Sequence, residues 1–476
     1  MATATAVDKF FHISERGSTV GTEIRGGIVT FFAMAYIVLL NPLIIGTGAD
    51  REGTVLGIPQ VAAATALVAG VMSILFGVVA KYPFGIATGL GLNSLVAVTL
   101  VGQQGLTWPE AMGLVVIDGI IICILAVSGF RTAVFRAIPD SMKAAMSVGI
   151  GMFIAMIGLV DAGFVRRIPD AALTTVPVQL GIGGSIASWP TFVFIIGLII
   201  CGYMVTRNVP GGLFLGIVIT TIISLVVESF VGAGSSAERP TGWSLAVPRL
   251  PDSFGGAPDL SIVGKIDPVG AFIHGGVIAT SLLVFTLVLA NFFDAMGTMT
   301  ALGNQAGLND ESGSLPGMKR ALIVEGFGAV VGGGASVSSN TVYVDSSAGI
   351  ADGARTGLAN VVTGILFLLA MFFTPLYEIV PIEAAAPVLV VVGALMMMQV
   401  TKIDWSQFYI ALPAFLTIVT MPFTYSIAHG IGVGFITFTL MAAFAGKAKQ
   451  IHGLMWAISI LFVIFFAHGP IMEALA

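Results

Sequence analysis

Charged side chains are scarce in this sequence: Asp, Glu, Lys and Arg make up 9% of its 476 residues, against about 25% in soluble globular domains. Hydrophobic residues account for 57%. A soluble protein of this length needs a charged exterior, which this composition cannot provide. The scarcity of charge therefore excludes a soluble globular fold and predicts that the lipid bilayer covers most of the surface.

Cysteine is almost absent as well. Cys123 and Cys201 lie in separate apolar segments and form neither a disulfide framework nor a metal-binding motif. The five histidines are scattered without the spacing of a metal site, so we expect no metal and no cofactor. The net charge of −5 is small and spread along the chain, which gives no indication of a nucleic-acid partner.

A removable signal peptide is also missing from the sequence. Residues 1–22 are polar and contain no short apolar core followed by a small-residue cleavage site. We interpret them as the cytoplasmic N-terminal segment of an integral plasma-membrane protein, whose first span acts as the insertion signal.

Long apolar segments are what the sequence has instead. A spanning helix needs about 20 apolar residues, and seven candidates precede a polar connection at 232–273 while seven follow it. They lie near 26–46, 60–80, 84–102, 110–130, 142–163, 190–206, 210–231, 274–300, 319–334, 336–352, 356–374, 384–401, 407–423 and 425–445. A last apolar segment, 453–471, either spans the membrane or lies at its surface. The pattern predicts an all-α polytopic membrane protein with about fourteen transmembrane spans.

The basic residues predict the orientation of these spans. With the N-terminus in the cytoplasm, fourteen Lys and Arg residues fall on the inner side and six on the outer side. This distribution follows the positive-inside bias. It places the 232–273 connection on the extracytoplasmic side.

The two sets of seven spans resemble each other, which predicts a first repeat at 23–231 and a second at 274–446, followed by a C-terminal segment at 447–476. Pro139 and Pro381 hold corresponding places, and both third spans, "PFGIATGLGLNSLVAV" and "GGGASVSSNTVYVDSSAGI", are interrupted by Gly and Ser. An odd number of spans inverts the second copy, and inverted repeats with broken helices are typical of secondary transporters. The alternative is that Gly-rich membrane helices resemble one another by composition.

Acidic residues inside predicted spans are few and costly, so each is a candidate for function. Asp294 lies in "LVLANFFDAMGTMTALG" and Asp345 lies in the interrupted segment "SVSSNTVYVDSSAGI". A carboxylic acid in a low-dielectric environment exchanges its proton nearer neutral pH than one in water, so both acids are candidates for proton coupling and substrate binding. The alternative is a structural carboxylate bonded to a neighbouring hydroxyl or amide, which we favour for Asp118 and Glu325.

Three polar neighbours complete the candidate site. Asn93 in "TGLGLNS" offers a donor and an acceptor, although its amide could instead cap the broken backbone. Tyr343 would face the same way as Asp345 if that segment is extended, because side chains alternate along a strand. Thr298 shares a helix face with Asp294. Packing is the alternative for Tyr343 and Thr298.

Several motifs, in consistent order, resemble a known family. They include "GTEIRGGIVTFFAMAYIVLLNP", "KYPFGIATGLGLNSLVAV", "ANFFDAMGTMTALGNQAG" and "LPAFLTIVTMPFTYSIAHGIGVGF". From about Glu15 to Gly446 the chain resembles the AzgA-like hypoxanthine/adenine/guanine permeases. These belong to a nucleobase transporter superfamily that also includes uracil and xanthine/urate carriers.

This resemblance implies a fold and a mechanism. It implies fourteen spans in two inverted sets, a core domain (spans 1–4 and 8–11) and a gate domain (spans 5–7 and 12–14). Short extended pieces in spans 3 and 10 would meet span 8 at the substrate. It also implies proton symport of purines, homodimers and elevator-like movement of the core against the gate.

The resemblance also implies the site residues, which are Asn93 with Gly91, Asp294 with Thr298, and Tyr343 with Asp345. The place of Asp345 is usually a Glu in similar sequences. The shorter side chain reduces the reach by about 1.5 Å, one carbon–carbon bond. The preferred purine, the stoichiometry and the carboxylate that carries the proton therefore stay open.

Two other functions are weaker alternatives. An anion exchanger on the same plan would need Arg or Lys near the interruptions, which carry acids instead. An intramembrane aspartyl protease resembles Tyr-Asp followed by Gly-x-Gly-Asp, whereas this chain has Tyr-Val-Asp, and Gly-Leu-Gly is followed by Leu. We therefore expect a transporter and not an enzyme.

Overall fold

The computed structural model describes residues 6–467, except for 129–137, 168–177, 210, 245–246, 251–254, 309–314, 377–378 and 425. The elements of the first half are α1 (Ala6–Phe11), α2 (Val20–Met34), α3 (Tyr36–Ile45), α4 (Ile58–Val79), β1 (Ile86–Thr88), α5 (Leu90–Ser94), the π-helix η1 (Leu95–Gln103), α6 (Trp108–Ser128), α8 (Asp140–Asp161), β2 (Val165–Arg167), β3 (Val178–Leu180), α9 (Trp189–Thr206) and α10 (Gly212–Val231).

The elements of the second half are α11 (Gly270–Gly275), α12 (Val277–Ala306), α13 (Met318–Gly334), β4 (Asn340–Val342), η2 (Val344–Ser346), α14 (Ser347–Ala351), α15 (Gly357–Ala370), η3 (Met371–Leu376), α16 (Ile382–Met397), η4 (Met398–Lys402), α17 (Phe408–Phe423), α18 (Ile427–Phe444), η5 (Ala448–Gln450) and α19 (Gly453–Phe466). The predicted helical membrane fold is confirmed in its coarse form. The last predicted segment, 453–471, is helical up to Phe466, and its final four residues lie outside the described part.

Seven helical stretches in the described part are long and apolar enough to cross a membrane: Val20–Ile45, Ile58–Val79, Trp108–Ser128, Asp140–Asp161, Trp189–Thr206, Gly212–Val231 and Ile382–Lys402. Six shorter apolar helices accompany them: Leu90–Gln103, Val277–Phe292, Gly357–Phe373, Phe408–Phe423, His429–Phe444 and Gly453–Ile464. Large apolar side chains such as Phe230 and Phe423 lie on the outer surface. Such a surface suits lipid as its solvent.

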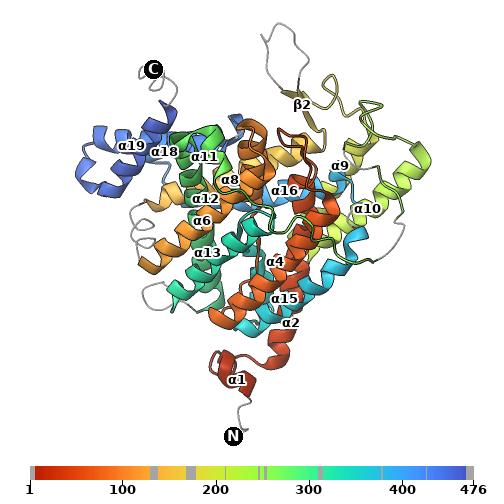
Figure 1. The fold of residues 1–476 in the computed structure, drawn as a ribbon, viewed down its shortest axis with the longest axis horizontal. Helices are drawn as coiled ribbons and strands as arrows, with labels where there is room; N and C mark the ends of the chain where they lie inside the picture. The colour runs from red at the N-terminus through yellow and green to blue at the C-terminus, as the bar shows by residue number, and fades with distance from the viewer. Residues whose placement is uncertain are drawn as a thin grey trace.

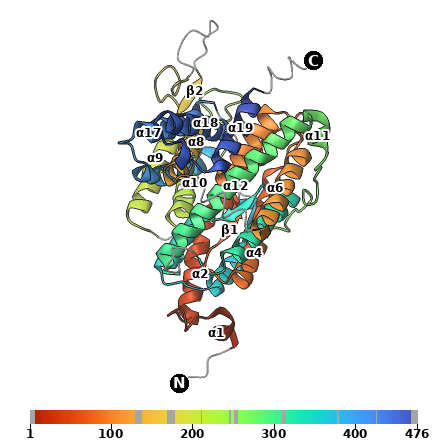
Figure 2. The same cartoon turned by 90° about the vertical axis from the view of Figure 1, so that its left-hand side faces the viewer.

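One group of helices surrounds the first strand pair. In it α4 packs on α15, α6 packs on α13 and α12, and α2 packs on α15. Figure 2 shows β1 in the middle of this group, between α12, α6 and α4. Small residues permit the close approach, since a methyl group added at Gly357 would lie 1.8 Å from the carbonyl oxygen of Gly77.

A second group of helices packs around α8 and α16. These two helices pack on each other, α17 packs on α8 and α18, and α9 packs on α10 and α16. In Figure 1, α9 and α10 lie toward one edge of the molecule and α18 and α19 toward the other. Strand β2 lies at the end of the molecule opposite α1.

Two short antiparallel sheets interrupt the helices. Strand β1 pairs with β4, with Ala87 opposite Thr341 and Thr88 opposite Asn340. Strand β2 pairs with β3, with Arg166 opposite Gln179; the sequence analysis did not anticipate this hairpin. Every residue of β1 and β4 is buried, so the pairing satisfies backbone groups where no water can.

The structure corrects two local predictions. The interruption predicted in the third span is short, since the extended part ends at Thr88 and α5 begins at Leu90, so Asn93 lies in a helix and not in broken backbone. Tyr343 and Asp345 do not share an extended segment, because η2 begins at Val344. A turn of 3₁₀-helix rotates successive side chains by about a third of a circle, so the alternation argument does not apply to this pair.

Candidate functional site

The candidate site is built around the antiparallel pair of β1 and β4, which we call the strand crossing. The amide of Gly89 donates to the Ser339 carbonyl at 3.0 Å, and the amide of Tyr343 donates to the Gly85 carbonyl at 2.9 Å. These two bonds extend the ladder at both ends. Each strand then turns into a helical segment, α5 after β1 and η2 after β4. Because the pair is antiparallel, α5 leaves the ladder at the Thr88 end and η2 leaves it at the Val342 end, and both ends are buried.

Asn93 lies inside α5 and points back toward β1. Its Nδ2 donates to the Thr88 hydroxyl at 3.0 Å, and its side chain is fully buried. Its Oδ1 is also buried and accepts no hydrogen bond from any described residue. The amide is thus half satisfied, with one acceptor left for a donor from outside the chain.

Asp294 reaches the crossing from α12. A methyl group added at Gly89 would lie 3.6 Å from Asp294 Oδ2, so the carboxylate stands beside the turn between β1 and α5. Glu325 of α13 lies within electrostatic range of it. Thr298 follows four residues later in the same unbroken helix, as predicted. Gly89 leaves room that any larger residue would fill.

Tyr343 and Asp345 meet a tyrosine that the sequence analysis missed. The Tyr343 hydroxyl donates to the Thr88 carbonyl at 2.6 Å. The Tyr36 hydroxyl donates to Asp345 Oδ2 at 3.1 Å, and the two tyrosine rings are 6.3 Å apart. A buried phenol in the middle of an otherwise apolar first span was the available signal for Tyr36.

Gly91 faces away from the strand crossing. A methyl group added there would lie 3.0 Å from Ile150 of α8 and 4.0 Å from Ile427 of α18. The glycine therefore marks the surface where the group around β1 meets the group around α8. The structure gathers Asn93, Asp294, Tyr343 and Asp345 around the crossing and places Gly91 on its far side.

Asp118, predicted to be structural, and Glu228, near the end of α10, both accept hydrogen bonds. Asp118 Oδ2 accepts from the Asn291 amide at 3.0 Å, and the same amide donates to the Ser339 hydroxyl at 2.8 Å. Glu228 accepts from the indole of Trp243 at 2.7 Å and from two backbone amides. These bonds tie α6 and α12 to the residue that precedes β4, and α10 to the connection that follows it.

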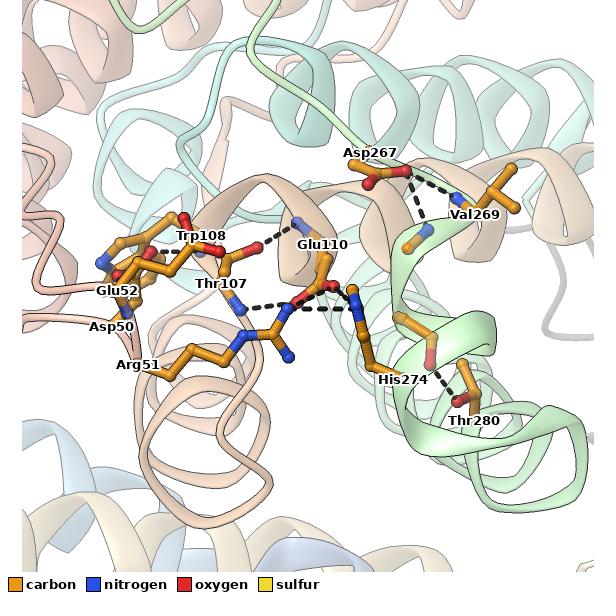
Figure 3. Close-up of polar contacts among 12 residues, drawn as sticks. Asp50, Arg51, Glu52, Thr107, Trp108, Glu110, Asp267, Val269, His274 and Thr280 are labelled. Atoms are coloured by element: carbon orange, nitrogen blue, oxygen red, sulfur yellow. Dashed lines mark hydrogen bonds and ion pairs between the residues drawn. The ribbon is translucent and has the colours of Figure 1, made fainter.

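A second polar cluster lies away from the crossing, at the start of α6. Figure 3 shows Glu110 between Arg51 and His274. Glu110 Oε1 is 2.9 Å from Arg51 Nη2 and 2.6 Å from His274 Nδ1, while its Oε2 accepts from the Thr107 amide at 2.8 Å. Three segments distant in sequence meet here, and no local pattern could have predicted their meeting.

The Permease family matches residues 21–433 of this chain. The guanine/hypoxanthine permease PbuG of Bacillus subtilis (strain 168) is 37% identical over 464 residues, covering 96% of this chain and 98% of the relative. The adenine permease AdeP of Escherichia coli (strain K12) is 33% identical over 460 residues, covering 96% of this chain and 95% of the relative.

A solved structure supports the fold alone. The transmembrane domain of the cyanobacterium bicarbonate transporter BicA aligns with a TM-score of 0.61 over 86% of this chain and 97% of that chain. The identity is 16%, so the likeness concerns the arrangement of helices and strands and not the substrate.

Proposed function

This chain belongs to the Permease family, and from that premise we propose that it is a secondary active transporter that imports purine nucleobases by proton symport. The two relatives described above are permeases for guanine and hypoxanthine and for adenine, which supports hypoxanthine, adenine and guanine as the substrates to test first. The match runs along almost the whole of both chains, so it includes every residue of the candidate site.

The observation that carries the proposal is the buried strand crossing with its unsatisfied amide. Non-helical backbone at membrane depth persists only where protein or a cavity satisfies it. Here it brings Asn93 Oδ1, which lacks a partner in the described chain, near a carboxylate on α12. An acceptor beside a carboxylate suits the N–H edge of a purine.

Each candidate residue then has a distinct role in our proposal. Asp294 and Asn93 accept hydrogen bonds from the ring N–H groups, and the Tyr343 ring packs on the flat heterocycle. Thr298 adds a hydroxyl one turn along α12. Gly91 permits close approach at the boundary with α8, where a methyl group would meet Ile150.

Proton coupling in this proposal uses Asp294 and Asp345. A neutral carboxylic acid and a carboxylate present different hydrogen-bonding edges, so the base binds one protonation state better than the other. Such a difference in affinity is what coupling requires. The Tyr36 hydroxyl holds Asp345 in place, since it donates to Oδ2.

The fold proposal is fourteen spans in two inverted repeats, with a core (spans 1–4 and 8–11) that moves past a gate (spans 5–7 and 12–14). Packing that repeats under exchange of the two halves supports it. Spans 2 and 11 pack as α4 on α15, and their counterparts 9 and 4 pack as α13 on α6. Spans 3 and 10 exchange with each other and meet as β1 and β4.

We also propose a plasma-membrane protein with a cytoplasmic N-terminus that works as a homodimer. The excess of Lys and Arg on one side supports the orientation. Tags at both ends, probed in intact cells and after permeabilisation, test the orientation. Chemical cross-linking in membranes, with a single band at the size of one chain as the contrary result, tests the dimer.

The transport proposal is tested by uptake of radiolabelled hypoxanthine, adenine and guanine in a host that lacks purine transport. We expect accumulation that a protonophore abolishes. Asp404→Asn, at a half-buried acid in a loop, serves as the control for Asp294→Asn. Uptake that ignores the proton gradient would remove the coupling, and accumulation of bicarbonate or sulfate without purines would favour the anion exchanger.

Substrate choice is tested by competition with uracil, xanthine, urate and the three purines on wild type and Asp345→Glu. The longer side chain extends the reach of the carboxylate by about 1.5 Å, one carbon–carbon bond. We expect the ranking of the bases to change. An unchanged ranking would show that this position does not set selectivity.

A further inference from the structure

A large cavity lies outside the strand crossing. Its volume is about 750 Å³, and its walls come from α3 and η1 on one side and from α8 and the start of α16 on the other. Ser236 and Ser244 of the connection line it as well. None of the six residues proposed for the transport site lines this cavity, but Ser94, the neighbour of Asn93, does.

The lining carries one charge of each sign. Asp161 is the last residue of α8, and its side chain makes no hydrogen bond or ion pair with another described residue, although the buried Glu383 lies within electrostatic range. Arg166 of β2 is held by two carbonyls, since its Nε donates to Gly163 and its Nη1 to Pro240, each at 3.1 Å. No ion pair joins Asp161 to Arg166 within the described chain; both line the cavity, and both lie within electrostatic range of Glu383.

The walls between these charges are apolar. Its apolar lining includes Leu43 of α3, Val98 of η1, Ile157 of α8 and Ile382 of α16. Ligand pockets of about 300–1,000 Å³ with mostly apolar walls and a few polar groups are the usual size for small molecules. Apolar walls accept the faces of a flat ring, while the two charged groups accept its polar edge.

From these features we propose that the cavity is a capture site that binds a neutral purine before it reaches the strand crossing. The carboxylate of Asp161 accepts an N–H of the base, and the guanidinium of Arg166 donates to a ring nitrogen or carbonyl oxygen. An anion would meet the carboxylate and a cation would meet the guanidinium, so a neutral heterocycle fits best. This inference rests on the proposed purine transport.

The path from the capture site to the transport site follows consecutive residues. Ser94 lines the cavity, and Asn93 next to it carries the unsatisfied buried oxygen. The cavity therefore reaches the neighbour of a residue that the proposal gives to the transport site, while Asn93 itself is buried behind the lining. The cavity lies on the side of the 232–273 connection, which the charge bias predicts to be extracytoplasmic.

The first experiment measures the concentration for half-maximal uptake in Asp161→Asn. We expect this concentration to rise about tenfold, as for loss of one hydrogen bond to a charged group, with the maximal rate retained. The control is Asp259→Asn, which changes an exposed acid of the 232–273 connection that does not line the cavity. Equal values for wild type and Asp161→Asn would overturn the capture site.

The second experiment detects occupancy without transport. Val98→Cys is labelled with a membrane-impermeant thiol reagent from outside, against the background of the half-buried Cys123 and the buried Cys201. We expect hypoxanthine to slow the labelling, and to do so even when Asp294→Asn has disabled the transport site. Thr47→Cys, also in the lining, gives the same readout if the first variant does not reach the membrane.

The outcomes separate the two proposals. A wild-type protein that takes up no purine would overturn the proposed function, whatever the labelling shows. Normal uptake with labelling that hypoxanthine does not slow would overturn the capture site alone. Labelling only from the cytoplasmic side would place the cavity on the other face of the membrane and would also overturn it.

Discussion

Two polar regions of this protein differ in how completely their polar atoms are paired. At the polar cluster at the start of α6, called the outer cluster below, both oxygens of Glu110 have partners, from Arg51, His274 and the Thr107 amide. At the strand crossing, Asn93 Oδ1 and Thr341 Oγ1 are buried without a partner in the described chain.

The comparison teaches how to distinguish a structural cluster from a binding site. A buried polar atom without a partner costs roughly 1–3 kcal/mol, so a chain retains one where something else completes it. A cluster whose every acceptor is used can fix the fold but has nothing left for a ligand. By this criterion the crossing is suited to bind, and the outer cluster is suited to hold three chain segments together.

The largest expected effect tests the binding region. Asp294→Asn should reduce purine uptake roughly 100-fold, because a charge-assisted hydrogen bond is worth up to about 3 kcal/mol. Thermal stability of the purified protein should stay the same or rise, because a buried carboxylate is replaced by a neutral amide. Initial uptake rates and melting in detergent measure the two quantities. Loss of stability without loss of uptake would reverse our assignment.

The next effect tests the outer cluster, where we expect a loss of stability with uptake retained. Glu110→Gln should lower the free energy of unfolding by about 1–3 kcal/mol, less than for a fully buried pair, because Arg51 and His274 are partly exposed. Uptake per folded molecule should change less than about twofold. The measurement is the melting temperature beside uptake normalised to surface expression. A specific loss of uptake would place the cluster in the transport machinery.

A smaller effect belongs to Asn93. Asn93→Ala removes the unsatisfied oxygen and the bond to the Thr88 hydroxyl, so affinity should fall about 2- to 10-fold, as for one neutral hydrogen bond. Asn93→Asp retains an acceptor and should lose less affinity than Asn93→Ala for bases that present an N–H. Equilibrium binding of radiolabelled bases to purified protein measures this. Equal affinities in all three proteins would show that the amide only caps the strand.

The smallest expected effect is on stability, at a carboxylate that is hydrogen-bonded but not fully buried. Hydrogen bonds from the Ser406 hydroxyl and the Gln407 amide hold the pKa of the half-buried Asp404 carboxyl below its ordinary value. A lowered pKa stabilises the folded state above the unfolded-state value, and this contribution is lost as pH falls through the folded-state value. Asp404→Asn should therefore lower the melting temperature slightly at pH 7, and the difference should shrink as pH falls below about 4 and vanish only below the lowered folded-state pKa. A difference that grows in acid would contradict this.

Much of the helical arrangement could be predicted because it depends on local composition. The apolar segments became helices near their predicted positions, since lipid requires every backbone group to be satisfied within the chain. The interrupted third span could also be located from its Gly and Ser content. The strand within that span could not be predicted, because Ile86 to Thr88 carry no local strand signal and depend on β4 for their hydrogen-bond partners.

The candidate site was predictable in its residues but not in its contacts. Asp294 and Asn93 were found because a charge or amide inside a span is costly. Tyr36 was missed, since its bond to Asp345 crosses 309 residues of sequence. The outer cluster was missed for the same reason, because Arg51 and His274 are 223 residues apart. Long-range pairing leaves no periodic pattern in the sequence.

The pairing of β1 with β4 also has a consequence for biosynthesis. Thr88 and Tyr343, joined by a hydrogen bond at the crossing, are 255 residues apart. At a translation rate of about 5–20 residues per second, the ribosome makes the partner roughly 10 to 50 seconds after the first strand. During that delay the nascent third span cannot rest in lipid with its strand unpaired. The insertion machinery, or the neighbouring nascent spans, must shelter it until the second half of the chain emerges.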